Sequence, residues 1–347
     1  MTPRTDWEGD LMSARYDFAS DNVAGAMPEA LQALADANAG FAGGYGSDPV
    51  TARAAELIRE RLDADAEVRF VASGTAANSL TVAALAQPHE AVICHRHAHI
   101  ATDETGAPGF FGSGLGLITL PGPSGRIDPA ALAAVLAEPE VSYHQSPAAF
   151  SLTNTTEYGA FYSEAAAAEL IGAAKAAGLK THLDGARLAN AAAAGFPLKR
   201  LGPLGLDVVV MGGAKPGSTP TEAIVLFDRS LARRFDARMK HAGQLVSKAR
   251  YFAAPWIGML ESGAWVTRAA HANAMARKLA ALMPFPVVHP VESNGVFVEM
   301  DAAAHERLRQ RGWFVYRFLD GTVRFMCSWA TTDEAVEAMG EALKSVA

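Results

Sequence analysis

Short apolar runs of strand-like length alternate with segments of helical pattern between residues 49 and 211. The predicted strands are 68–72, 91–94, 117–120, 149–152, 180–184 and 207–211, and the predicted helices are 49–61, 75–86, 129–136 and 163–177. Strands interleaved with helices in this way favour a mostly parallel sheet with helices on both faces. The pattern therefore predicts an α/β fold. A further strand at 223–228 follows a short Gly/Pro loop, which allows antiparallel pairing.

From about residue 250 the pattern changes. A long helical stretch at 257–282 is followed by strands at 296–300, 314–318 and 323–327 and by helices at 302–311 and 332–344. A chain of 347 residues is long enough for one large domain and a smaller one. We therefore predict a large domain over residues 1–249 and a small α+β domain over residues 250–347.

The composition is that of a globular protein, with 50% hydrophobic and 19% charged residues. A net charge of -7 argues against nucleic acid and anionic membranes as partners. The N-terminal stretch has no apolar core of a secretory signal, and no run approaches the ~20 apolar residues of a membrane helix. Cys94 and Cys327 lie in apolar sequence, which favours buried thiols in a reducing compartment. We expect a cytoplasmic protein.

A predicted strand ends at Val71-Ala72, and a predicted helix then begins around Ser73-Gly74-Thr75. The free N–H groups at the start of a helix can bind a phosphate. An ordinary Ser/Thr helix cap explains the same residues, and taken alone it is the better interpretation. The chain has no Gly-Lys dipeptide and no G-x-G-x-x-G after a strand, so neither a P-loop nor a Rossmann dinucleotide site is supported.

Asp184 stands at the end of the predicted strand 180–184, where ligands bind in open α/β sheets. A carboxylate there can pair with a pyridinium nitrogen, and Arg187 can pair with an anionic oxygen. An ion pair between Asp184 and Arg187 is an equally good interpretation of these two residues alone.

Lys215 follows the apolar strand 207–211 in a loop of small residues. It is one of only eight lysines, and a lysine removed from water is suited to form a Schiff base. Three features follow one another along the chain: the helix start at Gly74-Thr75, Asp184 at a strand end, and Lys215, 31 residues after Asp184. Together they resemble pyridoxal-phosphate (PLP) enzymes of the aspartate-aminotransferase fold type, also called fold type I.

The resemblance extends from about residue 17 to residue 330 and narrows to the threonine aldolase/β-eliminating lyase family. It is strongest to the low-specificity L-threonine aldolases and the phenylserine aldolases. The segments that carry it are Asp17–Asn22, Tyr45–Pro49, Ser73–Asn78, His99 with Glu104–Ala107, Asp184–Arg187, Gly213–Lys215 and Thr221–Ala223.

For the cofactor, the resemblance implies that Lys215 forms the Schiff base with PLP and that Asp184 pairs with the ring nitrogen. Gly74 and Thr75 would bind the phosphate, with Arg238 as a further phosphate ligand across a subunit interface. His99 would stack on the pyridine ring. Family members are dimers or tetramers with the site at an interface, so a homotetramer is expected.

For the substrate, the resemblance implies that Ser20, Arg187 and Arg324 hold the carboxylate, with Arg187 also near the ring oxygen. His144 would lie near the substrate hydroxyl, although its alignment needs a gap of one residue. The base for that hydroxyl would be His144, His99 or a water held by them. The implied reaction cleaves L-threonine, L-allo-threonine or phenylserine to glycine and an aldehyde. An aminotransferase or a side-chain β-eliminating lyase is the alternative within PLP enzymes.

Simpler interpretations remain for some of these residues. Arg324 also fits a surface strand, and residues 233–240 also fit a solvated helix face. The histidines of 95–99 do not have the spacing of a metal site, so no metal is predicted. The chain has 153–157 as Thr-Asn-Thr-Thr-Glu where many members have Glu-Asn-Thr-His, and Gly-Ala-Lys-Pro where others have Ser-Lys-Gly. Substrate preference and stereochemistry are therefore not predicted.

Overall fold

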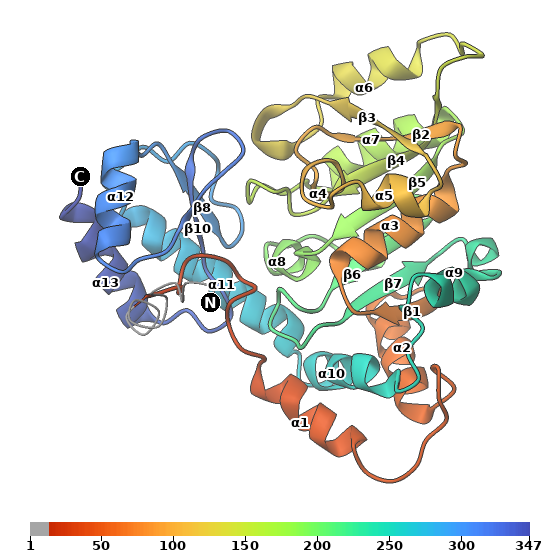
Figure 1. Cartoon of the computed structure of the whole chain (residues 1–347), viewed down its shortest axis with the longest axis horizontal. Helices are drawn as coiled ribbons and strands as arrows, with labels where there is room; N and C mark the ends of the chain where they lie inside the picture. The colour runs from red at the N-terminus through yellow and green to blue at the C-terminus, as the bar shows by residue number, and fades with distance from the viewer. Residues whose placement is uncertain (1–13) are drawn as a thin grey trace, which may run out of the picture.

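In the computed structural model, which describes residues 14–347, a seven-stranded sheet has the strand order β1-β7-β6-β5-β4-β2-β3 (Figure 1). Pairs among β2 to β6 are parallel, and β7 is antiparallel to both β1 and β6. The mostly parallel sheet and the antiparallel strand near residue 223 are both confirmed. The strands are β1 Glu67–Val71, β2 Glu90–His95, β3 Gly116–Leu120, β4 Ser146–Thr153, β5 Lys180–Gly185, β6 Val208–Gly212 and β7 Glu222–Leu226.

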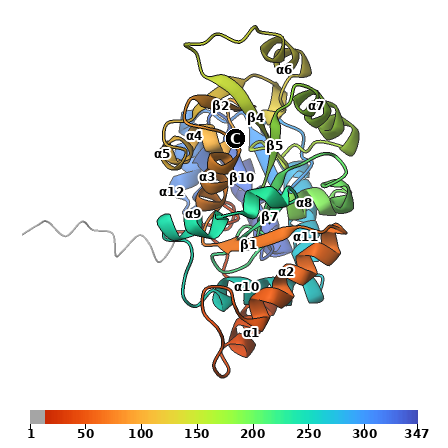
Figure 2. The same cartoon turned by 90° about the vertical axis from the view of Figure 1, so that its right-hand side faces the viewer.

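Helices cover both faces of this sheet. Successive residues of a strand point to opposite faces, and the central strands carry apolar side chains on both. Val209 and Val225 pack in one hydrophobic cluster, and Val208 and Ile224 pack in another on the opposite face. Figure 2 shows α3 on one side and α7 and α8 on the other. The helices of this part are α1 Pro28–Ala37, α2 Pro49–Leu62, α3 Gly74–Leu85, α4 His99–Thr102, α5 Ala107–Phe111, α6 Pro129–Leu136, α7 Glu164–Ala176, α8 Leu188–Ala193 and α9 Phe235–His241.

The C-terminal part forms a three-stranded antiparallel sheet in the order β8-β10-β9. Its core joins Phe325 of the sheet to Leu279, Met339 and Phe18. Phe18 comes from the N-terminal segment, whose backbone carbonyl accepts a hydrogen bond from the N–H of Met326 at 2.9 Å. The elements are α10 Arg250–Glu261, α11 Ala264–Ala281, β8 Gly295–Val298, α12 Ala302–Gln310, β9 Tyr316–Arg317, β10 Val323–Met326 and α13 Asp333–Lys344.

The helical stretch predicted at 257–282 is two helices, which corrects the sequence prediction. Gly263 adopts a φ of +75°, outside the helical region, and separates α10 from α11. The strand predicted at 314–318 is also shorter, because only Tyr316–Arg317 pairs with β10.

The contacts of α10 and α11 bear on where the large domain ends. α10 packs on α1 and α2, and Trp256 lies in the large hydrophobic cluster. α11 contributes Trp265 to that same cluster and Leu279 to the small one. The division at residues 249 and 250 stays a proposal, and this packing favours a boundary inside α11.

The prediction that the N-terminal stretch is not a secretory signal rests largely on residues 1–13. These lie outside the described residues. Within residues 14–347, no helix combines the length and the apolar character that crossing a membrane requires. Cys94 and Cys327 are both buried and unpaired by disulfide.

Candidate active site

A cavity of about 410 Å³ lies where the carboxyl ends of the parallel strands face the small C-terminal sheet. This is the edge at which open α/β sheets bind ligands. The segments around its walls come from both domains, so the site depends on how the two pack. It is lined by Ser20, Asn22, His99, Asp103, Glu157, Arg187, Lys215, Tyr316, Arg317, Phe318, Leu319 and Arg324.

Lys215 reaches this cavity because β6 ends in a tight glycine loop. A Cβ on Gly212 would lie 2.0 Å from the carbonyl oxygen of Ala186, so only glycine fits where β6 passes β5. The N–H of Gly213 donates to Oε2 of Glu222 at 2.7 Å, which ties the loop to the start of β7. The loop leaves the Lys215 side chain half-buried and facing the cavity.

Asp184 lies buried at the end of β5, beside this loop. Its Oδ1 accepts the N–H of Ala186 at 2.9 Å, and its Oδ2 accepts Nδ2 of Asn78 at 3.0 Å. Burial opposes charge on this carboxyl, but the positive charge of Lys215 and the Ala186 N–H outweigh burial and lower its pKa. An ionised, oriented carboxylate can keep a pyridine nitrogen protonated.

The start of α3 fits both interpretations of Ser73-Gly74-Thr75, as a helix cap and as a phosphate site. Ser73 is the N-cap, and its Oγ accepts the N–H of Ala76 at 3.2 Å. The N–H groups of Gly74 and Thr75 are left as the unpaired donors of the first turn. Asn78 lies one turn further along α3, about 6 Å along the axis from Gly74. Its bond to Asp184 therefore holds the N-terminal end of α3 near the carboxylate.

Arg187 forms a buried two-pronged ion pair rather than pointing freely at the cavity. Its Nε and Nη2 donate to the two oxygens of Asp21 at 2.6 and 3.0 Å, and Nη1 lies 3.9 Å from Glu157. Asn294 donates to the same Asp21 at 3.0 Å. Burial works against the charge of Asp21, but Arg187 prevails and lowers the pKa of Asp21 to about 2. The pair joins the N-terminal segment, the large sheet and the small domain at the cavity wall.

Arg324 projects from β10 with an unused donor. Its Nε is buried and has no hydrogen-bond partner among residues 14–347. Its guanidinium lies 5.1 Å from the ring centre of Phe318 and 5.9 Å from that of Tyr316, and burial lowers its pKa. A buried cationic donor without a partner is costly unless a ligand supplies one, and a carboxylate would do so. Ser20, half-buried, lines the same cavity.

His99 opens α4 and is held from behind by a buried carboxyl group. Its Nδ1 lies 2.8 Å from Oε1 of Glu104, whose side chain is fully buried and also accepts Nδ2 of Asn78 at 2.8 Å. The hydrogen bond to Glu104 raises the pKa of His99. The imidazole ring is thus fixed in orientation while it lines the cavity.

These groups match the demands of PLP one by one. Lys215 supplies an amine, Asp184 a carboxylate for the ring nitrogen, and the first turn of α3 two N–H donors for the phosphate. The carboxylate of an amino acid would supply the hydrogen-bond acceptor that the Nε of Arg324 lacks. Within residues 14–347, no cluster of three or more histidine, cysteine or acidic side chains is arranged to hold a metal ion.

Five predicted residues do not line the cavity: Gly74, Thr75, Asp184, His144 and Arg238. The last two are also exposed on other parts of the surface. His144 is exposed and precedes β4, at the strand end opposite to Thr153, which pairs beside Asp184. Within this chain, the predicted position of His144 beside the substrate hydroxyl is therefore not found. Arg238 is exposed on α9 and does not line the cavity, so a phosphate contact from it would have to cross between subunits.

Four residues of the site were given no role from the sequence: Asp21, Asn78, Glu104 and Glu157. Three of them stand inside the motifs that carry the family resemblance, so their positions were visible but their contacts were not. Glu157 stands in the segment 153–157 that departs from the commoner pattern. Contacts between side chains far apart in the sequence cannot be read from spacing.

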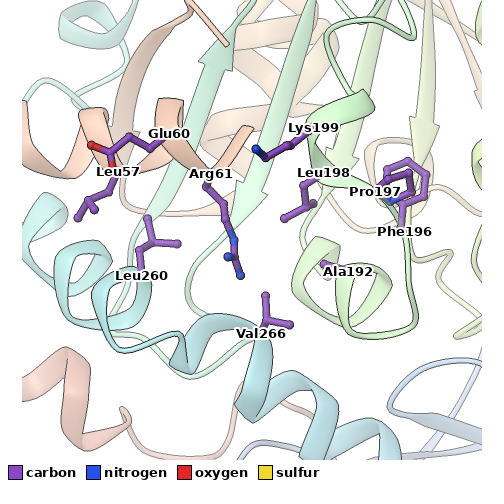
Figure 3. Close-up of a pocket in the computed structure, with 10 residues that line it drawn as sticks. All are labelled: Leu57, Glu60, Arg61, Ala192, Phe196, Pro197, Leu198, Lys199, Leu260 and Val266. Carbon is purple, nitrogen blue, oxygen red and sulfur yellow. The ribbon is translucent and has the colours of Figure 1, made fainter. Parts of the chain in front are cut away.

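A second cavity, of about 580 Å³, lies on the outside of the large domain between α2, α8 and the α10–α11 junction (Figure 3). Its walls are mainly apolar, with Arg61 extending between Leu260 and Ala192. It is larger than the Lys215 cavity but contains no buried acid, base or nucleophile. Size alone therefore does not identify the reactive site.

Comparison with known proteins identifies the family. The family model described as beta-eliminating lyase matches residues 17–303. Low specificity L-threonine aldolases of a Pseudomonas species and of Pseudomonas aeruginosa are 42% and 43% identical over 336 residues, covering 95% of this chain and 97% of each relative. The solved structure of Leishmania major threonine aldolase is 30% identical, covers 96% of this chain and 100% of its own, and superposes with a TM-score of 0.90. The chain belongs to the threonine aldolase/β-eliminating lyase family of fold type I PLP enzymes.

Proposed function

We propose that this protein is a PLP-dependent carbon–carbon lyase that cleaves β-hydroxy-α-amino acids such as L-threonine, L-allo-threonine and phenylserine to glycine and an aldehyde. The single observation that carries the proposal is one cavity lined by both Lys215 and Arg324, whose Nε has no partner among residues 14–347. An amine for the cofactor and a buried cation for a carboxylate are what an amino-acid substrate requires. The aldolase relatives support the choice of reaction.

Each residue has a proposed task. Arg324 and Ser20 hold the substrate carboxylate, and Arg187, fixed by Asp21, adds positive charge to that wall. Asp184 holds a proton on the ring nitrogen, while Gly74 and Thr75 bind the phosphate through their N–H groups. His99, oriented by Glu104, packs against the ring. Bound PLP supplies the acceptor for the electron pair of the broken Cα–Cβ bond.

The direct test is to incubate the PLP-loaded protein with L-threonine, L-allo-threonine and phenylserine. Glycine and the matching aldehyde should form in equal amounts, and the visible absorbance of the protein should change as substrate binds. Formation of a keto acid in place of glycine would assign the protein to transamination or β-elimination. Absence of bound PLP after loading would refute the proposal.

The proposal includes a cytoplasmic homo-oligomer, a dimer or a tetramer. Support comes from large apolar side chains on the surface, since Phe110 is 78% exposed and Tyr143 is 85% exposed. Arg238 would then reach a neighbouring subunit's phosphate. Light scattering of the purified protein tests this, and a monomer at micromolar concentration that retains full activity would contradict it.

A further inference from the structure

Glu157 lies in the wall of the Lys215 cavity, and no role has been assigned to it above. It follows β4 in a tight turn, in which the carbonyl of Thr156 accepts the N–H of Gly159 at 3.0 Å and the N–H of Thr156 donates to Ala160 at 2.7 Å. The side chain is 8% exposed, so it is directed into the protein and not into bulk water.

The turn that carries Glu157 is rigid. Oγ1 of Thr156 donates to the carbonyl of Ser124 at 2.8 Å, and Oγ of Ser293 donates to the carbonyl of Gly159 at 2.8 Å. Tyr158, next in the chain, is 2% exposed, and its hydroxyl lies 2.6 Å from Nδ1 of His97. A catalytic group gains most when its backbone is fixed before substrate arrives, and this turn meets that condition.

The carboxylate of Glu157 has free capacity to accept a proton. Its nearest cationic group is Nη1 of Arg187 at 3.9 Å, too long for a hydrogen bond. The stronger contacts of Arg187 are taken by both oxygens of Asp21. Glu157 is thus a buried carboxylate in the cavity wall, and Arg187, the cation nearest to it, is already paired with Asp21.

The other acid–base group on this part of the wall is less suited to accept a proton. Nδ1 of His99 is held by Glu104, and this bond raises the pKa of the imidazole. In the proposed function the ring of His99 packs against the cofactor, so this ring already has a task there. His144 lies outside the cavity. The titratable or charged side chains that line the cavity besides Glu157 are His99, Asp103, Arg187, Lys215, Tyr316, Arg317 and Arg324, and Asp21 and Asp184 act on them from behind.

We infer that Glu157 is the catalytic residue that accepts the proton of the substrate β-hydroxyl. This inference rests on the proposed aldolase function. The O–H bond breaks and its proton moves to the Glu157 carboxylate, while the O–H electron pair forms the carbonyl of the aldehyde. Bound PLP would supply the acceptor for the electron pair of the broken Cα–Cβ bond. Glycine is completed when Cα takes a proton from solvent together with that electron pair, and Glu157 returns its own proton to solvent, so charge and atoms balance.

The experiment compares Glu157→Gln with the wild type, since glutamine keeps the shape of the side chain but accepts no proton. The control is Glu164→Gln, which removes an exposed carboxylate that pairs with Arg200 at 2.7 Å, outside the cavity. Aldehyde release from L-threonine and phenylserine is measured against pH. Exchange of the glycine Cα proton with D₂O is measured by NMR, because it uses the same cofactor but involves no β-hydroxyl group.

Glu157→Gln should lower kcat for aldehyde release by about 10²- to 10⁴-fold, the usual contribution of a general base. Glycine exchange and PLP binding by absorbance titration should stay within about threefold of the Glu164→Gln control, and Glu157→Asp should recover part of the lost rate. An equal loss in cleavage and in glycine exchange, or a change in KM alone, overturns the inference. Wild-type protein that exchanges glycine but releases no aldehyde overturns the aldolase proposal itself, whatever the variant does.

Discussion

Nδ2 of Asn78 donates hydrogen bonds to two carboxyl groups at once, Oδ2 of Asp184 at 3.0 Å and Oε1 of Glu104 at 2.8 Å. One amide on α3 thereby connects the group proposed to pair with the ring nitrogen of PLP with the group that orients His99. The geometry of the cofactor pocket is set by this shared donor, which lies behind the residues that line the cavity.

Asn78→Leu should therefore weaken both cofactor binding and the fold. Two buried carboxyl groups lose a donor, and a buried acceptor left unpaired costs about 1–3 kcal/mol. Urea unfolding of the PLP-free protein should show a loss in that range, and the affinity for PLP should fall as well. Unchanged PLP affinity would show that Asp184 and α3 keep their positions without this bond.

Lys215→Ala should fold but bind PLP only without a covalent bond. The visible band of the Schiff base should be absent, borohydride should fix no cofactor to the chain, and aldehyde release should be lost. The matched control is Lys248→Ala, since Lys248 is exposed. Covalent fixation of PLP to the Lys215→Ala protein would place the cofactor on another lysine.

Arg324→Ala should raise KM far more than it lowers kcat, because a carboxylate held in both the bound state and the transition state contributes uniform binding. A hydrogen bond to a charged group contributes about 2 kcal/mol, which corresponds to roughly a 30-fold increase in KM. A useful comparison is Arg317→Ala, since Arg317 donates to the carbonyls of Gly321 and Met300, both at 3.0 Å. A loss in kcat alone for Arg324→Ala would assign it a different role.

Glu222 should make the stability of the PLP-free protein fall as pH rises. Burial raises the pKa of Glu222 to about 7. The folded state thus keeps this proton up to about pH 7, whereas an unfolded glutamate releases it near pH ~4.3. Stability from this group is complete below pH ~4.3 and declines until about pH 7.

His182 acts in the opposite direction over part of that range, because burial lowers its pKa to about 4. Below pH ~6.5 an unfolded histidine takes up a proton, whereas folded His182 stays neutral. The contribution of His182 to stability is therefore lost as pH falls from ~6.5 towards 4. Glu222→Gln removes only the first contribution. Its unfolding free energy by urea titration should therefore rise with pH from 4.5 to 6.5 more steeply than that of the wild type. Parallel curves would contradict the raised pKa.

The sequence by itself determined the α/β class, the order of the strands along the chain and the placement of candidate site residues at the ends of strands and helices. Apolar periodicity reports which residues are buried, and Gly74, Asp184 and Lys215 stand at strand or helix ends that the pattern locates. The break at Gly263 was missed because apolar residues continue on both sides of it, so the pattern does not show a change in φ.

Only the tertiary structure decided which side chains meet. Asp21 and Arg187 are 166 residues apart, and Asn78 and Asp184 are 106 apart. Glu157 and Arg324 reach one cavity only because the small domain packs against the carboxyl ends of the large sheet. His144 was placed at the site by spacing, yet the direction of β4 carries it to the other end of the strand. Local propensity sets the elements, but long-range packing sets which of their ends share a site.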